Sequence, residues 1–338
     1  METRTDMSIT TSREVRLLSR PTGLPTPATF SLETVELKPL DEGEVRVRNH
    51  FVSVDPYMRG RMNDGPSYAA PFALGKALDG GAVGEVIESR DPGLAVGTAV
   101  VSGMGWREAF VAHARELRPV SAENQPLSLY LGVLGMTGMT AWAGLNLVEV
   151  KAGDTIFISG AAGAVGNVAG QLAKLRGCRV IGSAGSPEKV EFLQEKCGFD
   201  AAFNYKDGPV LESLARAAPE GISVYFDNVG GESLEAALSA LRTHGRIVAC
   251  GSISGYNEAK PGPSNLMNVI GKRLTIRGMI VSDSMGQIGE FEREMGGYLR
   301  DGKIQSHETV VRGIENSVEA FLGLFRGDNV GKMVVDVR

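Results

Sequence analysis

A glycine-spaced stretch offers the first candidate chemistry. Residues 159–166 read SGAAGAVG, in which Gly160, Gly163 and Gly166 recur at every third position. The usual dinucleotide-binding fingerprint is G-x-G-x-x-G, so this spacing departs from it by one residue. Because 44 of the 338 residues are glycine, short glycine patterns also arise by chance. The stretch either cradles a phosphate or only lets a helix pack closely on its neighbours.

The flanking segments favour the phosphate-binding interpretation. DTIFISG at 154–160 is typical of a buried strand, and AVGNVAGQLAKLRG at 164–177 predicts a helix with one apolar face. A strand, a glycine turn and a helix N-terminus in this order offer backbone N–H groups and a partial positive charge to a pyrophosphate. The stretch therefore predicts a dinucleotide-binding loop, with ligand-free helix–sheet packing as the alternative.

The residues after the next strand bear on the choice of dinucleotide. An NAD site usually carries Asp or Glu about 20 residues beyond the glycine loop. Here the strand RVIGSAG ends without an acid, and Glu188 falls inside the following helix. Ser186 and Lys189 are suited to a 2′-phosphate, so the sequence favours NADP(H). Lys189 as a solvated helix lysine is the alternative. Tyr205, at the end of the third strand, either flanks the same phosphate or only covers the core.

Two kinds of segment must position these residues. Up to about residue 130 the chain is β-rich, as in EVRVRNHFVSV at 44–54, where Val45 and Val47 alternate with Arg46 and Arg48. Beyond it, strands alternate with helices, including one at 186–198 with Ser186 as N-cap and Pro at its first position. This pattern predicts an α/β protein with a doubly wound parallel sheet in its second part.

Composition narrows the function classes. The chain is 43% hydrophobic and 22% charged, as in soluble globular proteins. Its formal net charge of −5 argues against a nucleic-acid partner, and no apolar run is long enough to predict a membrane span. Cys178, Cys197 and Cys250 lie far apart and suggest neither a zinc ribbon nor a disulfide framework. The N-terminal stretch does not read as a secretory signal, so we expect a cytoplasmic protein.

Five spaced strings together resemble one family. They are VDPYMRGRM (54–62), GAAGAVG (160–166), FDNVGG (226–231), CGSISGYN (250–257) and GDNVGK (327–332). They are similar to motifs of the zinc-independent medium-chain dehydrogenases/reductases, in the branch of prostaglandin/leukotriene reductases, plant alkenal double-bond reductases and bacterial curcumin reductases. The resemblance runs from about residue 13 to the C-terminus.

The resemblance implies a fold and an activity. A GroES-like domain would cover 1–132, a Rossmann NADP-binding domain 133–305, and 306–338 would return to the first domain. The implied reaction is NADPH-dependent reduction of the C=C bond of an α,β-unsaturated ketone or aldehyde, usually by a homodimer. RLTIRGMIV at 273–281 is the predicted edge strand through which two copies would pair.

Site residues follow from the motif positions. Tyr256 would donate a hydrogen bond to the enolate oxygen, directly or through a ribose hydroxyl and water, and a phenol stays protonated at neutral pH as that role requires. Packing over the cofactor is its alternative role. Tyr57, with Tyr68, would edge the substrate pocket. The expected cofactor contacts are Gly163, Ala164, Val165, Gly166, Ser186, Lys189, Tyr205, Asn228, Cys250, Gly251, Ser252, Ile253, Tyr256, Ile280 and Asn329.

The sequence departs from the family's patterns at two places. Zinc-dependent members carry Cys and His ligands where this chain reads Val54-Asp55-Pro56-Tyr57 and Gly75-Lys76-Ala77, so we expect no catalytic metal. In the closer branch a loop often reads Gly-Met-Pro-Gly; here it is GMTGMT (135–140), with Thr137 replacing proline. That change either loosens the loop or has no effect. A quinone reductase and a non-catalytic NADPH-binding protein are the alternative functions.

Overall fold

The computed structural model describes residues 9–121, 123 and 125–338, which fold into two compact units. Unit 1 comprises the described residues up to Leu131, together with Val310–Arg326 and Met333–Arg338. Unit 2 comprises Gly132–Thr309 and Gly327–Lys332. The C-terminal part of the chain therefore contributes to both units. The domain limits expected from the sequence remain a prediction.

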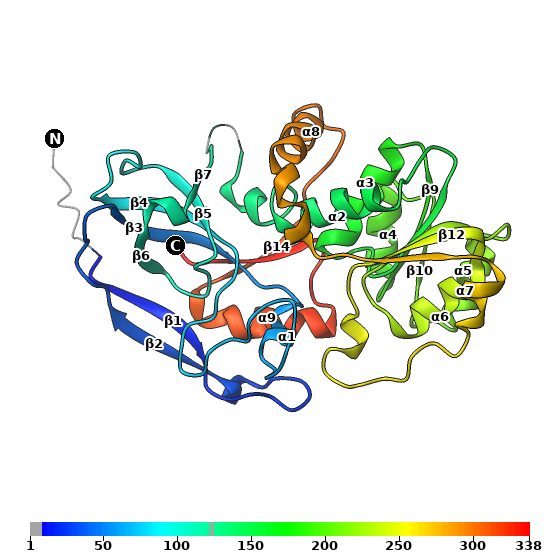
Figure 1. Ribbon diagram of the computed structural model, residues 1–338, viewed down its shortest axis with the longest axis horizontal. Helices are drawn as coiled ribbons and strands as arrows, with labels where there is room; N and C mark the ends of the chain where they lie inside the picture. The colour runs from blue at the N-terminus through cyan, green and yellow to red at the C-terminus, as the bar shows by residue number, and fades with distance from the viewer. Residues whose placement is uncertain (1–8, 122, 124) are drawn as a thin grey trace. The chain divides into compact units, whose positions relative to one another are not determined.

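Unit 1 is rich in β-structure. One sheet has the strand order β14-β15-β3-β4-β5-β7, with β6 pairing beside β3, and β1 and β2 form a separate antiparallel ribbon. Because β15 pairs antiparallel with β3, the end of the chain joins strands from its first third (Figure 1). The elements are β1 (Thr11–Leu17), η1 (Pro27–Thr29), β2 (Phe30–Glu36), β3 (Glu44–Ser53), α1 (Met58–Arg61), β4 (Ala82–Ser89), β5 (Ala99–Ser102), β6 (Ala109–His113), η2 (Ala114–Glu116), β7 (Arg118–Pro119), η3 (Leu127–Leu131), β14 (Glu308–Arg312), η6 (Ile314–Asn316), α9 (Ser317–Arg326) and β15 (Lys332–Asp336).

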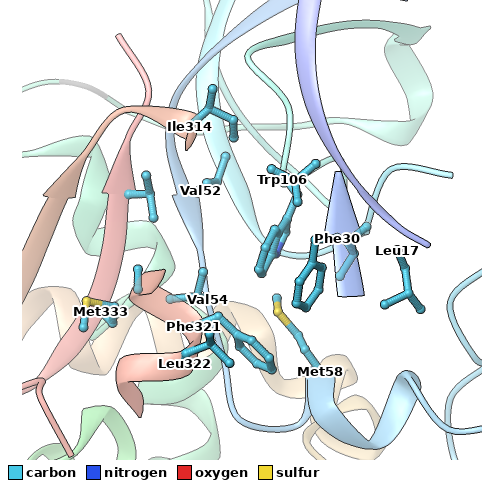
Figure 2. Packing of buried hydrophobic residues seen from close by; sticks show 14 of the residues in the cluster. Leu17, Phe30, Val52, Val54, Met58, Trp106, Ile314, Phe321, Leu322 and Met333 are labelled. Carbon is cyan, nitrogen blue, oxygen red and sulfur yellow. The ribbon is translucent and has the colours of Figure 1, made fainter. Parts of the chain in front are cut away.

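An aromatic cluster forms the main core of unit 1. The ring of Trp106 stacks on Phe30 at a centroid distance of 6.2 Å and meets Phe321 edge-on at 5.9 Å (Figure 2). Such pairs add about 0.5–1.5 kcal/mol each beyond the burial of their area. Met58, the first residue of α1, is buried in the same cluster. The core therefore anchors the short helix that begins directly after Tyr57.

Unit 2 is built on a parallel sheet. Its strand order is β10-β9-β8-β11-β12-β13, which is the order of a Rossmann fold and confirms the predicted class. The order reverses between β8 and β11, and ligands of such sheets bind at the carboxyl ends of the strands beside this point. The elements are α2 (Met136–Leu147), β8 (Thr155–Ile158), α3 (Ala164–Leu175), β9 (Arg179–Ala184), α4 (Pro187–Glu195), β10 (Ala201–Asn204), α5 (Val210–Ala217), β11 (Ile222–Asp227), α6 (Gly231–Ala240), β12 (Leu241–Ala249), η4 (Ile253–Gly255), α7 (Met267–Gly271), β13 (Thr275–Gly278), η5 (Val281–Gln287) and α8 (Ile288–Arg300).

Unit 2 contains the glycine turn and the helix N-cap that the sequence predicted. The glycine stretch joins β8 to α3, and α4 begins at Pro187 with Ser186 as its N-cap. The Ser186 hydroxyl accepts the backbone N–H of Lys189 at 3.4 Å, as an N-cap side chain should. Among the described residues, none of the helices combines the length and apolar character that a membrane span needs.

Candidate active site

The glycine loop makes the tight turn that the sequence predicted. Gly160 has a φ of 57°, a left-handed conformation that favours glycine, and its carbonyl accepts the Gly163 N–H at 3.0 Å. Gly163 is the N-cap of α3, which begins with Ala164. A Cβ on Gly166 would lie only 2.5 Å from the Gly160 carbonyl oxygen. The turn therefore holds the N-terminus of a 12-residue helix at the carboxyl end of β8, an arrangement suited to a pyrophosphate.

A segment from the far end of the chain lies beside this loop. Gly331 forms an isolated parallel bridge with Gly163, and its N–H donates to the Ala162 carbonyl at 2.8 Å. Gly331 has a φ of 67°, and a Cβ there would lie 2.0 Å from the His307 carbonyl oxygen, so only glycine fits. Asn329 is fixed in the same segment by a bond from its side-chain nitrogen to the Gly331 carbonyl at 2.8 Å. The structure thus brings Asn329 and the glycine loop together.

The predicted 2′-phosphate residues gather at the carboxyl ends of β9 and β10. The Tyr205 N–H donates to the Ala184 carbonyl at 3.0 Å, next to the Ser186 cap. The Tyr205 ring lies over Gly185, where a Cβ would come within 3.0 Å of the phenol oxygen. Tyr205 is 46% exposed, so part of its side chain is accessible at this edge. Ser186 and Tyr205 therefore place two hydroxyl groups at this edge.

Two lysines converge on the same edge. Lys189 is half-buried, and its Nζ donates to the Gly327 carbonyl at 2.6 Å. Burial lowers the pKa of Lys189, nearby Asp328 opposes the shift, and repulsion from Lys206 adds to it. The sequence analysis did not identify Lys206, although its place directly after the third strand was an available signal. Two repelling ammonium groups beside two hydroxyls fit the donor set that a 2′-phosphate requires.

A buried carboxylate organises the carboxyl end of β11. One oxygen of Asp227 accepts the Tyr225 hydroxyl at 2.7 Å and the N–H groups of Val229 and Gly230 at 3.0 and 2.7 Å. The Tyr225 hydroxyl also lies 2.9 Å from the Ser159 hydroxyl, which links β11 to β8. Burial raises the pKa of Asp227, and these donors oppose the rise. The sequence analysis missed this network, although an acid at the end of an apolar strand was a visible signal.

This network holds the next predicted residues in place. The Asn228 side-chain nitrogen donates to the Ser159 carbonyl at 2.8 Å. The N–H groups of Cys250 and Gly251 both donate to the Asp227 carbonyl at 3.0 Å. The carboxyl ends of β8, β11 and β12 are therefore tied together by main-chain and amide bonds, beside the glycine loop.

The loop that carries Tyr256 turns back on itself. The Tyr256 oxygen accepts the Ser252 N–H at 3.3 Å, and the Ile253 N–H reaches the Asn228 carbonyl at 3.4 Å. Tyr256 is half-buried and follows the single turn of η4. Ile280, which precedes η5, is also half-buried. The backbone N–H of Ser252, in the same loop, therefore orients the Tyr256 phenol.

The two predicted substrate-pocket tyrosines belong to unit 1. Tyr57 precedes α1 and is half-buried, whereas Tyr68 is 63% exposed. Burial raises the pKa of the Tyr57 phenol above its usual value, and Asp55 adds to the rise while Arg61 opposes it. Tyr57 therefore stays protonated and keeps a hydrogen bond to donate at neutral pH.

Thr137, which replaces proline in the family's loop, is held in place by a hydrogen bond. It lies in the first turn of α2, is buried, and donates its hydroxyl proton to the Gly132 carbonyl at 3.1 Å. A Cβ on the neighbouring Gly138 would lie 2.0 Å from the Val133 carbonyl oxygen, so the turn is also tightly packed. The hydrogen bond from the threonine hydroxyl therefore stabilises this turn in the absence of a proline ring.

The two parts of the chain match two described families. Residues 13–120 match the N-terminal domain of oxidoreductase, and residues 164–295 match the family described as zinc-binding dehydrogenase. Within residues 9–121, 123 and 125–338, no group of three or more His, Cys, Asp or Glu side chains is arranged to hold a metal ion.

Characterised relatives match over nearly the whole chain. NADPH-dependent curcumin reductase of Escherichia coli is 41% identical over 95% of this chain and 95% of its own length. Prostaglandin reductase 1 of Sus scrofa is 44% identical over 93% of this chain and 95% of its own length. The NADP(+)-dependent 2-alkenal reductase of Nicotiana tabacum is 42% identical over 96% of this chain and 97% of its own length.

Solved structures extend the comparison to the fold. The structure of CurA from Vibrio vulnificus in complex with NADPH superposes with a TM-score of 0.92 at 40% identity, covering 96% of this chain and 99% of the other. The Escherichia coli quinone oxidoreductase shares the fold at 22% identity and a TM-score of 0.76. The chain therefore belongs to the medium-chain dehydrogenases/reductases, in the branch that contains prostaglandin reductase 1, 2-alkenal reductase and curcumin reductase.

Proposed function

We propose that this chain uses NADPH to reduce the C=C bond of α,β-unsaturated ketones or aldehydes, without a metal ion. The supporting observation is identity of 41–44%, over nearly the full length, to proteins named curcumin, prostaglandin and 2-alkenal reductases. The cofactor is NADP(H), since relatives carry that dependence in their names and Lys189 and Lys206 supply cations beside β9. The likeness to a quinone oxidoreductase, at 22% identity, shows the fold alone.

The chemistry requires a donor at the substrate's carbonyl oxygen. When bound, NADPH supplies a hydride to the β-carbon of the enone. Negative charge then develops on the carbonyl oxygen, and a preorganised hydrogen-bond donor stabilises it more than it stabilises the neutral substrate. We assign this role to Tyr256. Its oxygen accepts the Ser252 N–H, which orients the phenol, and a phenol stays protonated at neutral pH. The α-carbon takes its proton from solvent.

A substrate screen tests this function. NADPH oxidation should be measured with alkenals, linear enones, curcumin-like diketones and quinones, and the products examined by mass spectrometry. We expect turnover of enones or enals to products in which the C=C bond is saturated and the carbonyl is kept. Turnover of quinones alone would replace the proposal with quinone reduction. Tight NADPH binding without turnover of any compound would favour a non-catalytic protein.

Removing metal ions should leave activity unchanged. The positions where zinc-dependent relatives carry ligands read Val54-Asp55-Pro56-Tyr57 and Gly75-Lys76-Ala77. Dialysis against a strong chelator, followed by the enone assay, should therefore give the rate of an untreated sample. Activity that disappears on dialysis and returns with added zinc would show that a metal acts in the reaction.

We propose a homodimer that forms through the β13 edge of unit 2. All four residues of β13 are exposed, including Ile276 at 44%, and α7 just before it exposes Met267 at 73% and Ile270 at 70%. An unpaired edge strand next to exposed apolar side chains is suited to pairing with a second copy. Light scattering at micromolar concentration should give the mass of two chains.

Substitutions locate the interface. The double variant Ile276→Glu/Met267→Glu should shift the mass to that of one chain. Leu211→Glu, at another exposed apolar position on α5, should leave it unchanged. A wild-type protein with the mass of one chain would reject the dimer.

A cytoplasmic location remains a proposal that rests on the thiols. Cys178, Cys197 and Cys250 are free cysteines in the structure. Burial raises the pKa of the Cys178 thiol to about 11 and that of Cys197 to about 12, so both stay protonated and unreactive. Three unpaired thiols fit a reducing compartment.

A further inference from the structure

The buried Asp227 carboxylate holds the turn that precedes helix α6. Asp227 is only 3% exposed, so the residues around it separate its side chain from any bound ligand. One carboxylate oxygen accepts the Val229 and Gly230 N–H groups at 3.0 and 2.7 Å. Gly230 has a φ of 70°, a left-handed conformation that favours glycine. Two main-chain bonds to a charged acceptor therefore fix the conformation of the 228–230 turn.

The same turn holds the loop that carries Tyr256. The Val229 carbonyl accepts the Ser254 hydroxyl at 2.6 Å and the Ser254 N–H at 3.2 Å. A Cβ on Gly230 would lie 2.4 Å from the Ser252 hydroxyl oxygen, so the turn and the loop are in close contact. Because N–H groups of the turn bond to the carboxylate while its carbonyls bond to the loop, a shift of the turn also moves the loop.

The Tyr256 phenol is the last member of this chain of contacts. Its oxygen accepts the N–H of Ser252, two residues before the Ser254 that bonds to the turn. We propose that Asp227 is a positioning residue, whose carboxylate sets the place of the Tyr256 phenol through the 228–230 turn and Ser254. The inference rests on the proposed function, in which the phenol stabilises charge on the substrate's carbonyl oxygen.

Asp227→Asn tests the role of the carboxylate. The variant keeps the shape of the side chain but replaces a charged acceptor with a neutral, weaker one. Since a displacement of about 1 Å at a reacting centre can cost up to about 100-fold in rate, we expect kcat to fall about tenfold. The Asn228 side chain bonds to the Ser159 carbonyl and not to the carboxylate, so the NADPH dissociation constant should change less than about threefold.

A double-mutant cycle distinguishes positioning from a general loss of stability. In the Tyr256→Phe background there is no hydroxyl to position, so Asp227→Asn should lower kcat there by less than about twofold. Ser254→Ala removes the hydroxyl bond to Val229 at a half-buried position, so it should fold even if Asp227→Asn does not. It should lower kcat about threefold, again only when Tyr256 is present. Equal effects in both backgrounds would overturn the proposal.

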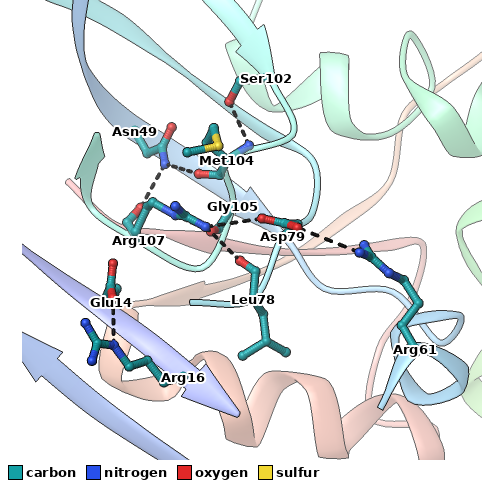
Figure 3. Close-up of polar contacts among 10 residues, drawn as sticks. All are labelled: Glu14, Arg16, Asn49, Arg61, Leu78, Asp79, Ser102, Met104, Gly105 and Arg107. Atoms are coloured by element: carbon teal, nitrogen blue, oxygen red, sulfur yellow. Dashed lines mark hydrogen bonds and ion pairs between the residues drawn. The ribbon is translucent and has the colours of Figure 1, made fainter. Parts of the chain in front are cut away.

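Two buried polar side chains elsewhere provide matched controls. Asp154, before β8, is 6% exposed and pairs with Arg246 at 2.7 Å. Asn49 in unit 1 is 1% exposed, and its side-chain nitrogen donates to the Met104 and Arg107 carbonyls at 3.0 and 2.8 Å (Figure 3). Asp154→Asn and Asn49→Ala should lower the temperature of thermal unfolding but leave kcat unchanged. They show the effect of lost buried bonds alone.

Hydrogen exchange tests the link without any substrate. Peptides that cover 250–257 should exchange faster in Asp227→Asn and Ser254→Ala than in the wild type, because N–H groups of the loop lose protection. Asp154→Asn should leave their exchange unchanged. Wild-type exchange in both loop variants would overturn the proposal, whichever compound the enzyme reduces.

The proposed function can fail separately from this link. The kinetic cycle uses whichever compound the substrate screen finds to be turned over. Faster exchange without turnover of any enone would count against the proposed function and leave the positioning of Tyr256 by Asp227 standing. Faster exchange together with a wild-type kcat in Tyr256→Phe would remove the phenol from the mechanism and still support the link between the carboxylate and the loop.

Discussion

Tyr256→Phe is expected to lower kcat for an enone about 30- to 1000-fold. The variant keeps the ring but removes the hydroxyl that would stabilise the developing negative charge, and such a transition-state hydrogen bond contributes roughly 2–4 kcal/mol. If a water molecule fills the gap, the loss will lie at the lower end. Single-turnover measurements with saturating NADPH check the effect on the chemical step directly.

Two controls separate this role from packing. The Tyr256 oxygen also accepts the Ser252 N–H, so the NADPH dissociation constant must be measured in the variant. A value close to wild type shows that the loop is intact. Tyr298→Phe removes a hydroxyl on α8 that bonds to Glu294 and should leave turnover unchanged. Unaltered kcat in Tyr256→Phe would remove this residue from the mechanism and direct attention to Tyr57.

Local signals in the sequence predicted much of the framework of unit 2. The glycine turn, the α3 helix and the Ser186 cap depend on residues within a few positions of one another, so pattern and propensity are sufficient to find them. The strand order could be expected as well, because alternating strands and helices have few right-handed arrangements. These features were visible without knowledge of any distant contact.

Other features depend on contacts that no local pattern encodes. Lys189 bonds to a carbonyl 138 residues away, and Gly331 lies beside Gly163. The alternation of apolar and charged residues in β3 also does not reveal that Arg46 is only 5% exposed. Its guanidinium is buried because it bonds to the Lys38 carbonyl at 3.0 Å and pairs with Glu88. The charge of Arg46 is thus satisfied by partners that the sequence pattern does not reveal.

Lys189→Ala is expected to weaken NADPH binding about 10- to 150-fold. A charge-assisted contact between the ammonium group and a 2′-phosphate, at a half-buried position, contributes on the order of 1.5–3 kcal/mol. NADH lacks this phosphate, so the preference for NADPH over NADH should shrink by a similar factor. Dissociation constants for both cofactors, measured for wild type and variant, check the prediction. Raising the salt concentration should weaken NADPH binding more in the wild type than in the variant.

The structure gives Lys189 a second task that this experiment must separate from the first. Its bond to the Gly327 carbonyl holds the segment that contains Asn329, so Lys189→Ala also releases a backbone tether. Loss of the tether weakens both cofactors equally and cancels in the ratio of their dissociation constants, whereas loss of the phosphate contact changes that ratio. Lys189→Arg should restore part of the preference, and Lys196→Ala, an exposed lysine at the end of α4, should leave it unchanged. Parallel changes for NADPH and NADH would leave Lys189 with the tether alone, and the preference for the 2′-phosphate would then have to come from Lys206 and Tyr205.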